Sequence, residues 1–281
     1  MRRIANTWEL MKSSWHILMR DKALLILPLI SGVAALLVLA AFFLPFMSTV
    51  PGGWHGDANP TFATYVIGFC YYLCNFFVIY FFNAALVDYV VTRLRGDEPS
   101  LGTSLREAAS CAPQLAMWAV AAATVGVVLQ AIQSRASILG KFVAGLIGVA
   151  WTLVTFFVVP LIVIERKGTL ESISESTAMV KKTWGEQAVS GLGYGLIGFL
   201  LCIPAFFLGV LAIMVLGTSG VKDAAPYILV VLGGIIWVVG VGVVMTALKA
   251  IFGVVLYLYT KTGKVPEGFS AGNLRSAIAS A

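Results

Sequence analysis

Residues 226–260 read PYILVVLGGIIWVVGVGVVMTALKAIFGVVLYLYT, and this stretch decides the class of fold. Lys249 is the one charged residue within it. A helix of about 20 apolar residues crosses the hydrocarbon core of a bilayer, so this run can span a membrane and tilt or extend beyond it. Its residues do not alternate between apolar and polar, which argues against a strand of a membrane barrel. The stretch therefore predicts a transmembrane helix.

Five more apolar stretches of spanning length precede this one, near residues 23–48, 63–92, 112–133, 139–164 and 187–217. The chain of 281 residues is 59% hydrophobic and 11% charged, whereas a soluble domain carries about 25% charged residues. Helices suit such runs because unpaired backbone groups are costly in lipid. We predict an all-α fold, a polytopic bundle of six spanning helices in a single membrane domain, 1–281. Residues 1–22 form an interfacial amphipathic helix, residues 23–260 hold the spans, and residues 261–281 form a tail.

The basic residues predict the orientation of the bundle. Most of the 19 Lys and Arg residues lie in the N-terminal segment, in the loops after the second and fourth runs, and in the tail. The opposite loops hold Arg135, Lys141 and Lys222. An excess of Lys and Arg marks the cytoplasmic side of a membrane protein. We therefore expect both termini to lie in the cytoplasm.

The second, fourth and sixth runs end alike, as YFFNAALVDYVVTRLRG at 80–96, TLVTFFVVPLIVIERKG at 152–168 and ALKAIFGVVLYLYTKTG at 247–263. Each closes with a basic residue one or two positions before a glycine, a pattern typical of helix C-terminal caps. An amphipathic segment also precedes each helical hairpin. The pattern predicts three repeats of an interfacial helix plus a transmembrane hairpin. The alternative is that any hairpin with cytoplasmic basic residues looks this way.

Three tryptophans mark the amphipathic segments, Trp8 and Trp15 in the first and Trp184 in the third. Helices with Trp on an apolar face and basic residues opposite lie in the headgroup plane. We interpret these residues as interfacial anchors and the lipid bilayer as the partner of this surface. In the second amphipathic segment, Ser104 and Glu107 have the spacing of a helix capping box.

Three stretches carry a resemblance to a known group: F-x-N-x-A-L-V at 81–87, T-F-F-V-V-P at 155–160, and V-K-K-T-W-G at 180–185. They resemble uncharacterised six-helix inner-membrane proteins of bacteria, a domain of unknown function. The group includes YciC-like proteins and the membrane domain of some glycerophosphodiester phosphodiesterases. The resemblance implies a multi-pass fold in the bacterial inner membrane. The soluble phosphodiesterase domain is absent here, so its activity is not carried over.

The sequence lacks the common motifs of enzyme and cofactor chemistry. There are two histidines and no HExxH motif, and no Walker A loop is present. We therefore expect no enzyme activity, no cofactor and no metal. Gly191 and Gly195 form a GxxxG within a predicted helix, which indicates close helix packing. The basic residues flank apolar runs instead of forming one basic patch, which argues against nucleic-acid binding.

Polar residues inside the predicted spans mark the candidate site, because such groups are costly in lipid and often functional. These are Asp88 and Asn83 in the second run and Lys249 in the sixth. Asp88 is either an interfacial carboxylate that pairs with Arg93 or is hydrated among the headgroups, or it faces the bundle interior and interacts with Lys249 directly or through water. Lys249 lies about 18 Å along the helix from Lys261, which strains a simple extension to the surface.

Two functions from different classes remain open on the sequence. Few intramembrane charges and three interfacial segments favour a non-enzymatic protein that organises the membrane or serves as a subunit of a partner complex. The polar residues and the repeat favour a channel or transporter for a small solute or ion. A homo-oligomer and a separate membrane-protein partner are both compatible with the first function.

Overall fold

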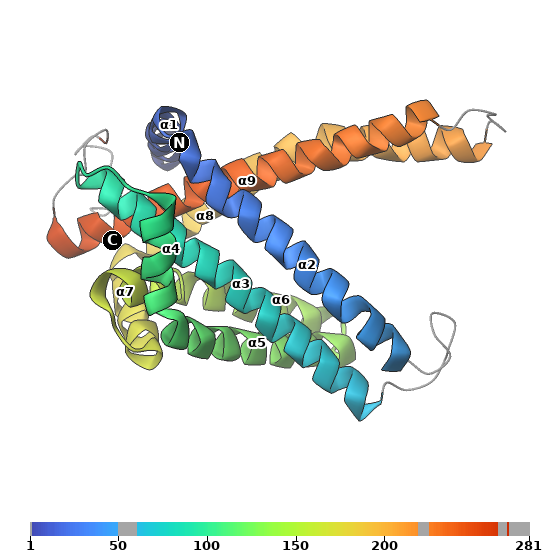
Figure 1. Ribbon diagram of the computed structural model, residues 1–281, viewed down its shortest axis with the longest axis horizontal. Helices are drawn as coiled ribbons and strands as arrows, with labels where there is room; N and C mark the ends of the chain where they lie inside the picture. The colour runs from blue at the N-terminus through green and yellow to red at the C-terminus, as the bar shows by residue number, and fades with distance from the viewer. Residues whose placement is uncertain (1, 50–60, 219–224, 264–268, 270–281) are drawn as a thin grey trace.

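The computed structural model describes residues 2–49, 61–218, 225–263 and 269, and it describes side chains there except at 2–10, 135, 138, 182–196, 216–218 and 225–226. These described residues form helices and no strand. The helices are α1 (Arg2–Arg20), a short 3-10 helix η1 (Lys22–Leu25), α2 (Ile26–Thr49), α3 (Phe62–Leu94), α4 (Leu101–Ser110), α5 (Ala112–Arg135), α6 (Ile138–Val154), α7 (Val158–Glu165), α8 (Thr169–Thr218) and α9 (Ala225–Thr262) (Figure 1).

Six segments of the described chain are long and apolar enough to cross a membrane, as the sequence predicted. They are Lys22–Thr49, Phe62–Leu94, Ala112–Ser134, Leu139–Glu165, Ile197–Val215 and Tyr227–Thr262. The fifth begins at Ile197, the first residue of α8 with a described side chain after 182–196, so the predicted start near 187 lies outside the described side chains. The protein is therefore an all-helical, multi-pass membrane protein.

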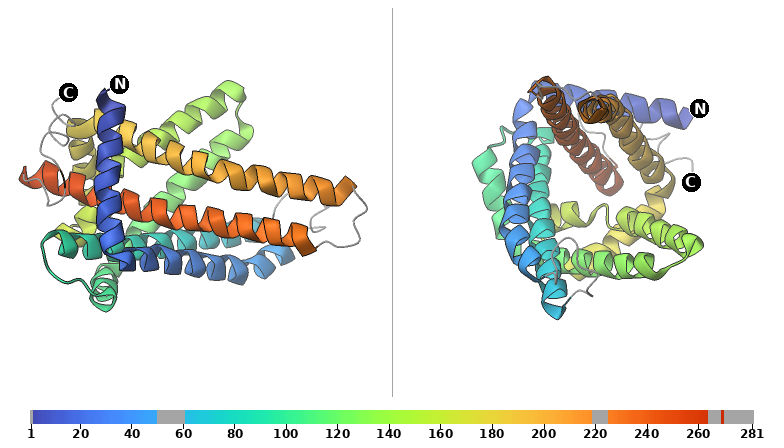
Figure 2. Two further views of the ribbon diagram at one scale, coloured as in Figure 1. Left: turned by 90° about the horizontal axis from the view of Figure 1, so that it is seen from above. Right: turned by 90° about the vertical axis from the view of Figure 1, so that its right-hand side faces the viewer.

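The spans form three hairpins, in which α2 packs on α3, α5 on α6, and α8 on α9. The hairpins meet where α2 begins and where α3, α7 and α9 end, which we name the closed end. From there they diverge toward the opposite, open end (Figure 1), and a view along the bundle shows them as three separate pairs (Figure 2). The short helices α4 and α7 lie at the closed end together with α1.

The buried core lies at the closed end. Its largest continuous contributions come from residues 84–91, where all but Asp88 are buried, and from 157–163 and 251–257. By contrast, residues near the open end stay exposed, including Leu44 at 74% and Leu139 at 73%. Because apolar surface is costly in water, these open-end surfaces are suited to contact lipid.

Aromatic rings join the first two hairpins inside the span. The ring of Trp118 on α5 lies between Tyr80 of α3 and Trp151 of α6, with ring centroids 5.5 Å and 5.9 Å away. Such pairs contribute about 0.5–1.5 kcal/mol beyond their buried area. Phe157, just before α7, and Tyr257 of α9 make a similar contact, with centroids 6.2 Å apart. These contacts fix where the hairpins begin to diverge.

The predicted fourth run, 139–164, is one apolar stretch but two helices, because the chain breaks at residues 155–157. Pro160 has no N–H to donate to the carbonyl four residues earlier, which weakens the helix at this point. The buried Ser176 of α8 bridges the break: its Oγ accepts from the Phe157 N–H at 3.1 Å and donates to the Val154 carbonyl at 2.6 Å. The break is therefore satisfied from another helix.

Two of the three predicted glycine caps are confirmed, since Gly96 and Gly263 adopt left-handed φ angles of 92° and 67°. The third is wrong. Arg166, with φ 56°, ends α7 two residues before Gly168. A left-handed non-glycine residue costs about 1 kcal/mol or more, and contacts of the Arg166 side chain described below offset this cost.

The predicted capping box at Ser104 and Glu107 is also wrong. The helix α4 begins four residues earlier than that box predicts, with Ser100 as its N-cap, so Ser104 lies buried inside the helix. The amphipathic segments are helical, as α1, α4 and the start of α8, and each precedes a hairpin. The common origin of the three units stays a prediction. The side chains of Trp8 and Trp184, and the packing around Gly191 and Gly195, lie outside the described residues.

We expect Ser176→Ala to lower the free energy of unfolding by about 1–3 kcal/mol, because the buried Phe157 N–H loses its acceptor. Thermal unfolding in detergent measures this change. The matched control is Ser174→Ala, an exposed serine on the same helix, which makes the same change in helix propensity. Equal stability of the two variants would show that the bridge contributes nothing.

Candidate functional site: an ion-pair cycle at the closed end

The structure does not bring the sequence-predicted polar residues together. Asp88 is half-buried on α3, and Asn83 is half-buried five residues earlier on the same helix. Within the described residues, Asp88 forms an ion pair with neither Arg93 nor Lys249. Arg93 instead lies 3.7 Å from Asp21, and Lys249 is exposed on α9.

The position of Lys249 follows from its neighbour on α9. Leu248 lines an apolar groove whose other wall includes Met11 and Trp15 of α1. The helix α1 therefore packs on α9 near Leu248, the residue that precedes Lys249.

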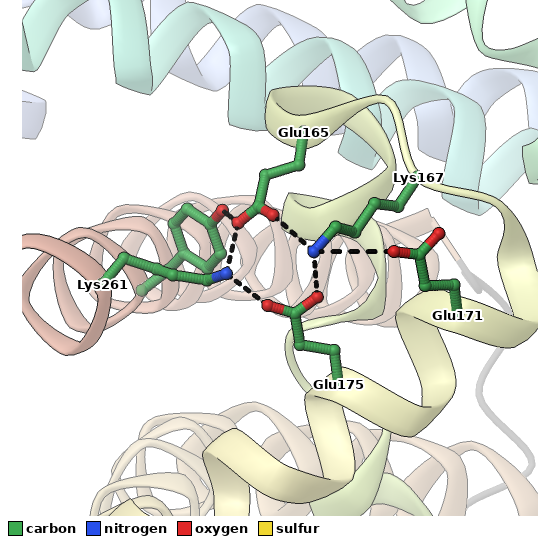
Figure 3. Close-up of polar contacts among 6 residues, drawn as sticks. Glu165, Lys167, Glu171, Glu175 and Lys261 are labelled. Atoms are coloured by element: carbon green, nitrogen blue, oxygen red, sulfur yellow. Dashed lines mark hydrogen bonds and ion pairs between the residues drawn. The ribbon is translucent and has the colours of Figure 1, made fainter.

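The densest cluster of charge lies instead at the closed end. Glu165 ends α7, Lys167 lies in the turn after it, Glu175 is on the first part of α8, and Lys261 is near the end of α9 (Figure 3). Each lysine contacts both glutamates. The Lys167 and Lys261 ammonium groups each lie 2.8 Å from Glu165, and both also donate to Glu175. We name these four residues the ion-pair cycle.

Two further groups attach to the ion-pair cycle. The Tyr257 hydroxyl, one turn before Lys261 on α9, donates to Glu165. Glu171 lies 3.8 Å from Lys167, and its side chain is 62% exposed. The four members of the cycle are less exposed, at 23–31%. The contacts therefore join α7, α8 and α9 in a partly desolvated position, where ion pairs are stronger than on an open surface.

The local sequence explains why these residues meet. The helix break and the left-handed Arg166 end α7 early, so Glu165 and Lys167 both project toward the start of α8. Thr169 anchors that start by donating to the Gln114 carbonyl of α5 at 2.9 Å. The Gly263 cap ends α9 just after Lys261. The ends of α7 and α9 and the start of α8 therefore supply the charged residues of the ion-pair cycle.

The electrostatics favour the charged forms. Hydrogen bonds to Glu165 and Glu175 raise the pKa of Lys167 above its ordinary value. The same hydrogen bonds from Lys167 and Lys261 lower the pKa of Glu175. Two carboxylates and two ammonium groups leave the cycle itself without net charge near neutral pH. This balance permits the cycle to stay partly buried.

A second contact set joins α4 to α7. The Arg166 guanidinium donates to the Glu107 carboxylate and to the Ser110 hydroxyl, and it also contacts the Cys111 sulfur. Planar guanidinium groups suit such multiple contacts better than an ammonium group does. This explains why Arg166 holds the left-handed conformation that a glycine adopts more readily.

A third contact set joins the start of the first span to the end of the second. The Tyr89 hydroxyl donates to both carboxylate oxygens of Asp21, at 3.2 Å and 3.1 Å. The same carboxylate accepts from the Ala23 N–H and lies 3.7 Å from Arg93. Asp21 therefore caps η1 and holds it against α3. Asp21 is not among the site residues predicted from the sequence.

The arrangement can fix helix ends relative to one another, and the described residues include no group of three His, Cys, Asp or Glu side chains placed to hold a metal ion. Sequence reasoning missed the ion-pair cycle because Lys261 lies 86 residues from Glu175 in the chain. The available signal was the set of basic helix ends at 167 and 261, facing the acidic stripe of Glu171 and Glu175.

We expect Glu175→Gln to lower the free energy of unfolding by about 1–2 kcal/mol at pH 7, because Lys167 and Lys261 lose a charged acceptor. Since the folded-state pKa of Glu175 is lowered, its stabilisation is present above the ordinary value of 4.5 and is lost as the pH falls through the folded-state value. The difference between variant and wild type should therefore shrink below pH 4.5.

Thermal unfolding from pH 7 to pH 3 measures this difference, and Glu171→Gln is the matched control. Its more exposed, longer contact should make its effect smaller than about 0.5 kcal/mol. A difference between Glu175→Gln and wild type that stays constant with pH would contradict the assigned role of the carboxylate.

Comparison with known proteins gives one family match. A family model described as a family of unknown function, DUF6159, matches residues 62–268. That region runs from the start of α3 past the end of α9 and so contains the whole ion-pair cycle. Neither the curated proteins nor the solved structures give a match. The likeness to YciC-like proteins and to phosphodiesterase membrane domains stays a prediction. Because the match covers well over half of the chain, this protein belongs to the DUF6159 family.

Proposed function

We propose that this protein is a non-enzymatic membrane-organising protein whose diverging hairpins hold lipid, or a partner subunit, between them. The observation that carries the proposal is the contrast between the two ends of the bundle. Ion pairs and a buried core join the helices at the closed end, and the hairpins diverge with exposed apolar residues toward the open end (Figure 1).

A cavity near the open end supports this proposal. It lies among α2, α3 and α5, has a volume of about 840 Å³, and is lined largely by aromatic and aliphatic side chains, including Phe42, Phe46, Phe69, Tyr72 and Val127. Lipid tails are as apolar as these side chains, so hydrocarbon covers them without a hydrophobic penalty. An apolar segment of a partner would cover them equally well.

In the proposed orientation, the closed end lies at the cytoplasmic side of a bacterial inner membrane. The basic residues support this orientation, since the closed end carries Arg20, Arg93, Arg95, Lys167 and Lys261. Basic residues next to spans favour the cytoplasmic face. The amphipathic helix α1 would then lie among the headgroups of the inner leaflet.

The character of the open-end cavity tests the proposal directly. We expect a spin label at Val127, which lines the cavity, to be accessible to oxygen, which partitions into lipid, and inaccessible to a water-soluble nickel complex. The label would be attached to the cysteine of the Val127→Cys variant in reconstituted protein. The native cysteines would first be replaced by alanine, at Cys70, Cys74, Cys111 and Cys202. Electron paramagnetic resonance relaxation measures both accessibilities.

The matched control is Val128→Cys, the next residue of α5, which is 52% exposed and does not line the cavity. We expect both positions to show the oxygen-accessible pattern. A nickel-accessible label at Val127 beside an oxygen-accessible label at Val128 would show that water fills the cavity, and the lipid-holding proposal would then be wrong.

A second candidate, a channel or transporter, is favoured by one observation. The ion-pair cycle closes one end of a bundle that diverges at the other, and the half-buried Asp88 lies near the closed end without an ion-pair partner among the described residues. Charged groups of this kind mark solute pathways in many membrane proteins.

Liposome flux separates the two candidates. We expect purified protein to pass ions and small solutes no faster than protein-free liposomes, because the cavity lining of the open end is mainly apolar. Wild type, Asp88→Asn and Lys249→Ala would be compared at equal protein content. Flux that falls in Asp88→Asn would place transport first and mark α3 as the pathway.

A further inference from the structure

A basic cavity lies at the closed end, between α1 and the end of α3. Its volume is about 740 Å³, and it is lined by Lys12, Ser13, His16, Ile17, Arg20, Arg93, Leu94 and Gly96. Three of these side chains are cationic at neutral pH, a fourth is a histidine, and none is acidic. The cavity is therefore suited to an anion.

Asp21 is the carboxylate that lies against Arg93, one of the lining residues. Asp21 accepts from the Tyr89 hydroxyl and the Ala23 N–H, and its side chain is 14% exposed. Its contact with Arg93 is made by Nε, at 3.7 Å. The two terminal nitrogens of Arg93 form no hydrogen bond among the described residues, and they remain available to a ligand in the cavity.

The position of the cavity identifies the source of the anion. Arg20 lies two residues before the first span, and Arg93 lies at the last turn of the second. Basic pockets at this level between helices meet the phosphate groups of anionic lipids. A free phosphate would present similar chemistry, but it has no apolar part to contact the apolar surface beside this cavity.

That apolar surface is the groove on the adjacent side of α1. It has a volume of about 770 Å³ and lies between α1 and the hairpin of α8 and α9, with Trp15, Trp237, Ile236 and Leu248 among its lining residues. Lys12 lines both this groove and the basic cavity. A charged head and an apolar chain therefore find neighbouring surfaces on the same helix.

We propose that this basic cavity binds the phosphate headgroup of an anionic phospholipid, with an acyl chain along the neighbouring apolar groove. Arg20 and Arg93 contact the phosphate from opposite walls, and Lys12 contacts it at the boundary between the two surfaces. The inference deepens the proposed function by naming the lipid class, and it rests on a different part of the molecule from the open-end cavity.

Native mass spectrometry of the detergent-purified full chain tests the site. The ligands are phosphatidylglycerol, zwitterionic phosphatidylcholine with the same chains, and inorganic phosphate. We expect phosphatidylglycerol to bind most tightly and to raise the unfolding temperature. In the double variant Lys12→Gln/Arg20→Gln its affinity should fall about thirtyfold, since each basic contact near a lipid surface contributes about 1 kcal/mol.

The matched control is Arg106→Gln/Lys181→Gln, which removes the same charge from two exposed residues that do not line the cavity. We expect it to bind phosphatidylglycerol within about threefold of wild type. An equal loss in both double variants would show general surface attraction and overturn the proposal. Equal affinity for the two lipids would also overturn it, and so would inorganic phosphate binding as tightly as phosphatidylglycerol.

A third variant guards against loss of folding. Arg20→Lys keeps the charge and should retain most of the phosphatidylglycerol affinity and its thermal shift, whereas Arg20→Gln alone should lose about fivefold. No difference between these two variants would contradict a contact of Arg20 with the phosphate. None of these measurements depends on the open-end label at Val127, so either proposal can fail without the other.

Discussion

Apolar helices in a bilayer gain no hydrophobic free energy by packing on one another, because lipid chains cover them equally well. A bundle of such helices must be gathered by other interactions, and here these lie at the closed end. Three sets of charged contacts join the helix ends, around Glu165 and Glu175, around Arg166, and around Asp21. Without a corresponding set described at the open end, the hairpins are free to diverge.

The position of these contacts follows from the cost of burying charge. An ion pair in hydrocarbon loses most of its Coulomb energy to desolvation, whereas at the end of the spans each group keeps part of its hydration. The four residues of the ion-pair cycle are in this intermediate environment, because their side chains are 23–31% exposed. The buried rings of Phe157 and Tyr257 lie just inside the cycle and exclude water from one side of it.

The spans were predictable from sequence because hydropathy acts over about 20 residues, and small errors at the ends do not change the result. The helix ends were less predictable because single contacts decide them. Gly168 is the residue type that usually caps a helix C-terminus, but the left-handed Arg166, which contacts α4, ends the helix two residues earlier. Likewise, nothing near Pro160 in the sequence indicates that Ser176 repairs the break. Arg93 was expected to pair with Asp88 because both lie on the same helix. It lies instead against Asp21, a residue that precedes the first span and is remote from Arg93 in the chain.

Arg93 links the Asp21 contact set to the proposed lipid site at the closed end. Its Nε faces Asp21, which holds η1 against α3, while its side chain also lines the basic cavity beside α1. A phosphate in that cavity would add a second anion to one guanidinium, and a planar fork can bind two anions on different edges. The lipid headgroup and the carboxylate would then hold α1, the start of the first span and the end of the second at one point. Lipid bound there would strengthen the closed end, which is the part of the molecule that keeps the hairpins together.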